Sequence, residues 1–234
     1  MLVRGMLLIL SILFTVPAAP ANAIQLSPLS QCGKERWNTK TLDDPDARSV
    51  NQTPKASTIA ALVGSPVPAN YSVNNDTQRY APIEDTVYTL RALLVGFKEE
   101  TDRDLHIVIA DPSLTNLTMA DLTPKTGGKR PAAIMIAEIP DPQCYSVRAG
   151  GHADEIARVR SSFEQCFGAP SESFHLFTGQ MIVDISGVGF FDKLHGQTGV
   201  AKNGIELHPV LHIKTVSGAC PTGYSVFNNS TGSQ

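Results

Sequence analysis

The length and charge of the chain exclude some classes of protein. It has 234 residues, with 19 lysines and arginines against 22 aspartates and glutamates, and a formal net charge of −3. A chain of this length forms one domain or two small ones. The slightly acidic balance differs from the basic surface that nucleic-acid-binding proteins usually carry, so an anionic substrate would require a local basic patch or a metal ion.

The first residues have the pattern of a cleaved secretory signal. Arg4 is followed by an apolar run over residues 6–16 and by an Ala-Asn-Ala triplet that ends at Ala23, which matches a basic start, an apolar core and small residues at the cut. The run is shorter than the roughly 20 residues that span a bilayer. We therefore expect cleavage near Ala23, a secreted or periplasmic protein, and no stable membrane insertion. A membrane anchor is the alternative.

The four cysteines, Cys32, Cys144, Cys166 and Cys220, all follow the expected cleavage site. An even count in an exported protein indicates disulfide bonds. Three pairings are possible. We favour Cys144–Cys166 with Cys32–Cys220, which would close one compact segment and tie an N-terminal arm to the last strand. The alternative, a zinc ion held by cysteines, lacks the C-x-x-C pair typical of such sites.

The chain divides into three parts after the signal, residues 1–23. Residues 24–80 are rich in proline, asparagine, serine and threonine, with one short apolar stretch from Ile59 to Val63, so we expect an arm packed on the body. Residues 81–220 carry the regular apolar patterns of a folded domain. Residues 221–234 are small and polar, which is typical of a flexible tail.

The central part shows five strand patterns and one helix pattern. β-rich apolar runs that end at charged residues or proline predict strands. In residues 154–168, Ile156, Val159, Phe163 and Phe167 recur at a spacing of three or four, which predicts a helix. The expected strands are residues 87–97, 104–110, 133–139, 180–191 and 204–216.

The order of these elements, β-β-β-α-β-β, is that of the OB-fold. This fold is a five-stranded Greek-key barrel in which the loops between strands 1 and 2 and between strands 4 and 5 frame the ligand cleft. We therefore expect a mainly β, α+β protein with an OB-fold-like barrel and an N-terminal arm. An α+β sandwich with the same element counts is the alternative.

Acidic and histidine side chains gather at two strand starts. Asp102, Asp104 and His106 lie two residues apart, so they share one face of a strand. Glu206 and His208 have the same spacing at the start of the last strand, and a carboxylate and an imidazole so placed can share a metal ion. The alternative for both groups is an ordinary solvent-exposed strand face.

The segment between the last two expected strands, residues 192–204, has the composition of a ligand-binding loop. Its three glycines permit sharp turns and a close approach of the backbone to a ligand. His195 and Asn203 are its best polar candidates, and Lys193 and Lys202 can contact the backbone of an anionic substrate. The alternative is an ordinary long hairpin connection.

An OB-fold barrel would bring these groups to one rim, because the second and fifth strands begin where the two cleft loops end. Glu138, at the end of the third strand, would join them. His212 continues the row of His208, although Pro209 predicts a bulge or an edge position there. Carboxylates and imidazoles gathered in this way can hold a divalent cation and leave one side chain as a general base.

Five stretches of the chain form a further pattern, residues 35–41 (ERWNTKT), 104–111 (DLHIVIAD), 135–140 (MIAEIP), 189–197 (GFFDKLHGQ) and 203–210 (NGIELHPV). This pattern resembles a widespread group of uncharacterised secreted bacterial proteins. The resemblance covers most of the chain after the signal and implies no activity.

Asp102, Asp104 and Glu138 also stand at places comparable to the metal-binding acids of the staphylococcal-type thermonucleases. This more distant similarity implies a secreted OB-fold phosphodiesterase that depends on calcium. The chain departs from that family because it has no D-G-D turn, no R-x-x-x-D-x-P-E run and no evident pair of catalytic arginines.

The leading hypothesis is a secreted phosphodiesterase that depends on a divalent metal ion, in particular a nuclease with nucleic acid as its substrate. Histidine ligands favour zinc or another transition metal, with calcium or magnesium as alternatives, and the metal would activate water. The expected metal ligands are Asp104, His106, Glu206 and His208, the expected catalytic residues are His195, Glu138 and Asp102, and the expected substrate-binding residues are Lys193, Lys202 and Asn203.

The second hypothesis is a non-enzymatic OB-fold module outside the cytosol that binds an oligosaccharide, a peptide or an envelope protein. It agrees with the acidic net charge and needs no metal ion. Other enzyme classes are not indicated, because the chain has no G-x-S-x-G, P-loop or G-x-G-x-x-G element of the kind that marks serine hydrolases and nucleotide-binding enzymes. The sequence identifies no protein partner.

Overall fold

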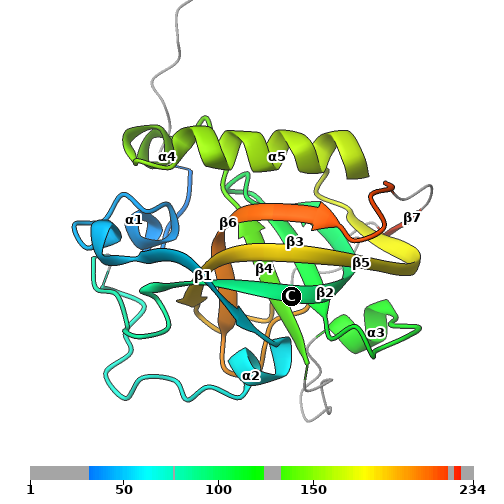
Figure 1. Cartoon of the computed structure of the whole chain (residues 1–234), viewed down its shortest axis with the longest axis horizontal. Coiled ribbons are helices and arrows are strands. Elements are labelled where there is room, and N and C mark those ends of the chain that lie inside the picture. The colour runs from blue at the N-terminus through cyan, green and yellow to red at the C-terminus, as the bar shows by residue number, and fades with distance from the viewer. Residues whose placement is uncertain (1–31, 76, 124–132, 221–223, 228–234) are drawn as a thin grey trace, which may run out of the picture.

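Five strands close into a β-barrel (Figure 1). The computed structural model describes residues 32–75, 77–123, 133–220 and 224–227, so the expected signal peptide lies outside it. The barrel strands are β2 (Thr86–Glu99), β3 (Leu105–Ala110), β4 (Ile134–Ile139), β5 (Phe174–Phe191) and β6 (Ile205–Thr215).

The strand order around the barrel is β2-β3-β4-β6-β5, and β5 pairs with β2 to close it. Neighbouring strands run antiparallel except β4 and β6, which are parallel. The longest helix of the described residues, α5 (Ala153–Phe167), lies between β4 and β5 in the chain. The predicted mainly β protein with an OB-fold-like barrel is therefore confirmed.

Short elements surround the barrel. The edge strand β1 runs parallel to β2, and β7, within the segment expected to be a flexible tail, pairs antiparallel with β5. The remaining residues of that tail, 221–223 and 228–234, lie outside the described ranges. The short elements are α1 (Trp37–Lys40), a 3-10 turn (Ala47–Ser49), β1 (Asn51–Ser57), α2 (Ile59–Val63), α3 (Met119–Leu122), α4 (Tyr145–Ala149) and β7 (Tyr224–Phe227).

Strands β3 and β4 are buried along their whole length. Leu105, Ile107 and Ile109 of β3 face the main core, whereas Val108 and Ala110 belong to a second, smaller apolar cluster. A strand covered on both faces carries a nearly continuous apolar run. A polar residue on such a strand is consequently buried, whichever face it occupies.

The helix α5 spans one end of the barrel, while α2 and α3 lie toward the opposite end (Figure 1). Ile156, Val159, Phe163 and Phe167 are buried, as their spacing predicts. Gly168 follows the last helical residue with a φ of 93°, a conformation that a side chain disfavours. The apolar face of α5 therefore packs on the barrel and its end is set by glycine.

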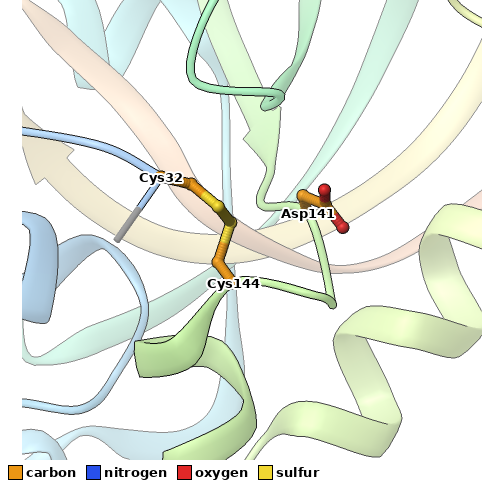
Figure 2. Close-up of side chains that lie close together, drawn as sticks. All are labelled: Cys32, Asp141 and Cys144. Atoms are coloured by element: carbon orange, nitrogen blue, oxygen red, sulfur yellow. A yellow bond between two sulfur atoms is a disulfide. The ribbon is translucent and has the colours of Figure 1, made fainter. Parts of the chain in front are cut away.

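The predicted disulfide pairing is wrong, although all four cysteines are paired. The bonds are Cys32–Cys144, shown in Figure 2, and Cys166–Cys220. Cys144 precedes α4 and Cys166 lies near the end of α5, so about 20 Å of helix separates them at 1.5 Å per residue. A disulfide joins Cα atoms about 4.4–6.8 Å apart. The observed bonds have Cα–Cα distances of 5.6 Å and 5.1 Å.

A buried ion pair fixes the arm to the barrel. The Arg36 Nη1 donates to Glu84 Oε1 at 2.7 Å and to the backbone carbonyl of Phe191 at 3.1 Å. The guanidinium also lies 4.6 Å from the ring centroid of Phe190. Glu84 in turn accepts from the backbone N–H groups of Tyr80 and Phe191. One carboxylate thus joins the arm to the end of β5.

We expect Glu84→Gln to lower the free energy of unfolding by about 3–5 kcal/mol, because it leaves the Arg36 charge buried without a counter-charge. Urea titration followed by circular dichroism measures this change. The matched control is Arg91→Ala, which removes an exposed Arg91–Asp184 pair and should leave the unfolding midpoint unchanged. Equal effects of the two substitutions would contradict this account of the arm.

Candidate functional site

Three adjacent strands carry the acidic and histidine residues singled out in the sequence. His106 of β3 pairs directly opposite Glu138 of β4, so the two side chains share a face of the sheet. The parallel register of β4 and β6 aligns Ile136 with Glu206 and Ala137 with Leu207, which places position 138 beside His208. The strand register alone therefore brings Glu138 between two histidines.

His208 is surrounded by three carboxyl groups. Its Nδ1 lies 3.0 Å from Glu206 Oε1 and 3.1 Å from Glu138 Oε2, and its Nε2 lies 3.3 Å from Asp104 Oδ2. The rings of Trp37 and Phe190 approach the imidazole in edge-to-face geometry. The ring is thus held by acids at both nitrogens and by aromatic rings against its body.

His106 has a different pair of partners. Its Nδ1 lies 2.9 Å from Glu138 Oε1 and 3.3 Å from Glu100 Oε1. Its Nε2 lies 2.8 Å from the backbone carbonyl of Thr198. Because a carbonyl only accepts, Nε2 carries a hydrogen and donates it. Glu138 therefore contacts both histidines, one with each carboxylate oxygen.

Two segments that are distant in sequence cover the face of the sheet that carries His106, Glu138 and His208. From the arm, Lys40 places its Nζ 3.1 Å from Asp192 Oδ1, with an exposed fraction of 8%. From the loop between β5 and β6, Gly199 donates its N–H to the Leu122 carbonyl, and its φ of 76° and its closeness to Val108 leave no room for a side chain. The exposed fractions are 0–6% for Asp104, His106, Glu138, Glu206 and His208. An exposed strand face is thereby excluded for these five residues.

Burial and mutual contact shift the pKa values of these groups in opposite directions. Burial alone would raise the pKa of Glu138, but hydrogen bonds from His106 and His208 hold it well below its usual value. Burial alone would lower the pKa of His208, but the surrounding carboxylates raise it well above its usual value.

Three further carboxyl groups hold their protons more strongly than usual, and burial is the main cause of the raised pKa for Asp104 as for the other two. Burial, together with the carboxylates of Glu138 and Asp192, raises the pKa of Glu206 to about 8. Burial and the neighbouring Asp104 raise the pKa of Asp102 to about 7. The buried centre, formed by Asp104, His106, Glu138, Glu206 and His208, therefore contains one strongly acidic carboxyl group, Glu138, and two weakly acidic ones, Asp104 and Glu206.

Some polar atoms of this centre make no hydrogen bond within the part of the chain that the structure describes. They are both carboxylate oxygens of Asp104 and the Nε2 of His208. One donor atom each from Asp104, Glu138 and His208 lies within 4.8 Å of the other two. Two ligands about 2.1 Å from one zinc ion at a tetrahedral angle are about 3.4 Å apart, close to the 3.3 Å between Asp104 Oδ2 and His208 Nε2. The donor set fits a divalent metal ion.

A separate group of possible ligands, near the start of α4, does not fit a metal ion. Cys32, Cys144 and Asp141 lie together (Figure 2), but the two sulfur atoms are bonded to each other and so provide no thiolate. The Asp141 carboxylate pairs with Arg103 at 3.0 Å. This grouping is a disulfide beside an ion pair.

The expected loop residues stay outside the buried centre. The His195 side chain is half-exposed, with its Nε2 4.0 Å from Asp192 Oδ2. Lys193 pairs with Glu35 at 3.3 Å, and Lys202 is exposed. Asn203 donates from its Nδ2 to backbone carbonyls at the end of α2, which anchors the loop.

The structure places His212 and Asp102 differently from what the sequence predicted. His212 is exposed and does not continue the row of His208, because the register of β5 and β6 shifts beside Pro209; the bulge predicted there is present. Asp102 is half-buried next to the centre, where its Oδ1 accepts from the Asp104 N–H at 3.2 Å.

Sequence reasoning missed the residues that cover the centre, namely Trp37, Lys40, Asp192 and Thr198. They lie in the arm and in the loop between β5 and β6, far in sequence from β3 and β4. The stretches 35–41 and 189–197, singled out in the sequence by a resemblance to a group of uncharacterised proteins, contain three of the four. That resemblance was the only feature of the sequence that pointed to any of these covering residues.

Comparisons with protein-family models, with curated proteins and with solved structures each found no match to this chain. Among the described residues, no helix combines the length and apolar character needed to cross a membrane. The two disulfides indicate an oxidising environment.

We expect the free energy of unfolding of the metal-free protein, kept so by a chelator, to depend on pH because of the buried centre. The lowered pKa of Glu138 contributes stability above about pH 4.3, which is lost as the pH falls through the folded-state value. The raised pKa of His208 contributes stability in full below about pH 6.5, which is lost as the pH rises through its folded-state value. His208→Gln should therefore cost most, about 3 kcal/mol or more, at about pH 5–6.

Urea unfolding of wild type and variant across this pH range measures the difference. His195→Gln is the matched control, because that histidine is half-exposed and lies outside the centre. A difference between wild type and His208→Gln that stays constant from acid to neutral pH would show that the contacts of His208 are not electrostatic.

Proposed function

We propose that this chain binds a divalent transition metal ion at Asp104, Glu138 and His208, a group we call the inner site, and that the ion stabilises a closed OB-fold-like module outside the cytosol. The observation that supports this most directly is the buried carboxylate of Asp104, which faces His208 Nε2 while none of these atoms makes a hydrogen bond in the described chain.

The energetic argument concerns Asp104. A buried carboxylate without hydrogen bonds is costly, more so than the roughly 1–3 kcal/mol of a neutral unsatisfied group. Among the described residues its close ionic partner is His208, at a distance and geometry that give no hydrogen bond, and the charge of Lys40 also favours its ionised form. A divalent cation between the two would satisfy both oxygen and nitrogen donors. The inner site therefore has the donors of a metal site, and its Asp104–His208 pair lacks a hydrogen bond.

The surroundings of His208 support the same assignment. Metal-binding histidines commonly donate their other ring N–H to a carboxylate, which fixes the ring orientation. Here Nδ1 lies 3.0 Å from Glu206 Oε1, and Trp37 packs against the ring. A donor set of one imidazole and two carboxylates favours zinc or a neighbouring first-row metal over magnesium.

Burial favours a stabilising role over an open catalytic one. Catalytic metal sites keep a position open to water and substrate, whereas structural sites are closed. The three inner-site residues have exposed fractions of 0–6%, and Lys40 and the loop between β5 and β6 lie over them. This assignment joins the expected divalent cation to the hypothesis of a non-enzymatic module.

A nuclease is the second candidate. Asp104 and Glu138, the two acids that the thermonuclease resemblance places near its metal, belong to one donor group in an OB-fold-like barrel. Hydrolysis of a nucleic acid at that group would require the loop that carries Thr198 to move away from His106. A metal ion there would then polarise the phosphate and activate water.

We expect the purified, oxidised protein to bind one zinc or cobalt ion per chain at the inner site. Metal at about 100 times its dissociation constant adds about 2.7 kcal/mol of stability, which raises the Tm by about 5–10 °C for a protein of this size. Elemental analysis after gel filtration and thermal unfolding with and without chelator measure the two effects.

Asp104→Asn should abolish the ion at the inner site and the rise in Tm that it produces. Asp102→Asn, the matched control two residues away, should retain both, and circular dichroism verifies that each variant is folded. If metal still raises the Tm of a folded Asp104→Asn variant, the proposed inner site is wrong.

The two candidate functions make opposite predictions for nucleic acid. The closed module predicts no cleavage of plasmid DNA or RNA with zinc, cobalt, manganese or calcium. The nuclease predicts cleavage that a chelator stops and that Glu138→Gln abolishes. Chelator-sensitive cleavage lost in that variant would replace the first candidate by the second.

A further inference from the structure

Glu138 belongs to two groups of possible metal ligands. With Asp104 and His208 it forms the inner site, and with Glu100 and His106 it forms a second group whose donor atoms also lie within 4.8 Å of one another. The two oxygens of Glu138 contact different histidines, Oε1 the Nδ1 of His106 at 2.9 Å and Oε2 the Nδ1 of His208 at 3.1 Å. Because Glu138 belongs to both donor groups, its one carboxylate can bridge two cations.

The chemistry of His106 supports a ligand at Nδ1. Its Nε2 donates to the Thr198 carbonyl at 2.8 Å and its Nδ1 forms a hydrogen bond with Glu138 Oε1, so loss of the Nδ1 proton leaves a neutral ring with its lone pair on Nδ1. That lone pair faces Glu100 Oε1 and Glu138 Oε1 at 3.3 Å and 2.9 Å. A divalent cation bound by these three atoms would take the place of the Nδ1 proton, and a backbone carbonyl behind the ring is a common support of a metal-binding histidine.

The second group is nearer to solvent than the inner site. The side chain of Glu100 is 24% exposed, and Lys98, 17% exposed, places its Nζ 2.8 Å from Glu100 Oε1. This is the same oxygen that faces His106. The lysine ammonium therefore supplies positive charge beside Glu100 and competes with any cation that binds there.

We propose that Glu100, His106 and Glu138 form an outer site for a second divalent cation, bridged to the inner site by Glu138. Because it shares Glu138, this inference rests in part on the proposed function. Two cations on one bridging carboxylate provide adjacent positive charges for an oxyanion such as a phosphate group. Only the outer one lies near the surface.

Titration with Mn²⁺ of the full oxidised chain tests the proposal, with bound metal counted by elemental analysis and spin coupling followed by electron paramagnetic resonance. Wild type should bind two ions with coupled spectra. Glu100→Gln and Asp104→Asn should each bind one ion with an uncoupled spectrum. Lys98→Met should tighten the weaker ion roughly tenfold, because it removes a competing charge.

Glu155→Gln is the matched control, since Glu155 forms a comparable pair with His152 at 3.0 Å on α5, outside the centre. It should leave both ions in place, and circular dichroism verifies that every variant is folded. One ion in wild type that Asp104→Asn removes and Glu100→Gln does not would overturn the outer site while the inner site stands.

A different pattern of metal loss in the same two variants would support the outer site and contradict the inner one. One ion in wild type that Glu100→Gln removes and Asp104→Asn retains would establish the outer site and overturn the inner one. A wild-type protein that binds no ion with zinc, cobalt or manganese would overturn both.

Discussion

The structure depends on one constraint, the burial of the Glu138 carboxylate between His106 and His208. The antiparallel register of β3 and β4 and the parallel register of β4 and β6 must both hold for these three side chains to meet. A slip of one residue on either side would turn a charged group into the apolar core. The centre therefore specifies the register of three barrel strands as firmly as their apolar side chains do.

The fold was predictable because its signals are local. Alternation along strands, the 3–4 spacing of Ile156, Val159, Phe163 and Phe167, and the order β-β-β-α-β-β all lie within short windows of sequence. The one large boundary error is the start of β5, at Phe174 in place of Gln180. It arose because Gly179 interrupts the apolar pattern and conceals that the strand continues around it.

The site was predictable in part, and for a related reason. Period-two spacing identified Asp104 with His106 and Glu206 with His208, and the barrel topology added Glu138. Their burial was not predictable, because the segments that cover them come from Lys40 and Thr198, which are remote in sequence. The prediction of the cysteine pairing failed for the same reason. The pairing depends on where the two ends of α5 lie relative to the arm and the last strand, and these segments are remote in sequence.

The Cys32–Cys144 bond has a consequence for how the centre stays covered. It ties the segment that leads into Trp37 and Lys40 to the segment that follows Glu138, so it joins the cover of the buried centre to its bridging carboxylate. A reduced chain lacks this tether, and its arm is held over the acids and histidines by non-covalent contacts such as the Arg36–Glu84 pair alone. The bond therefore adds a covalent link, which restricts the unfolded chain, to the non-covalent contacts that keep the centre covered.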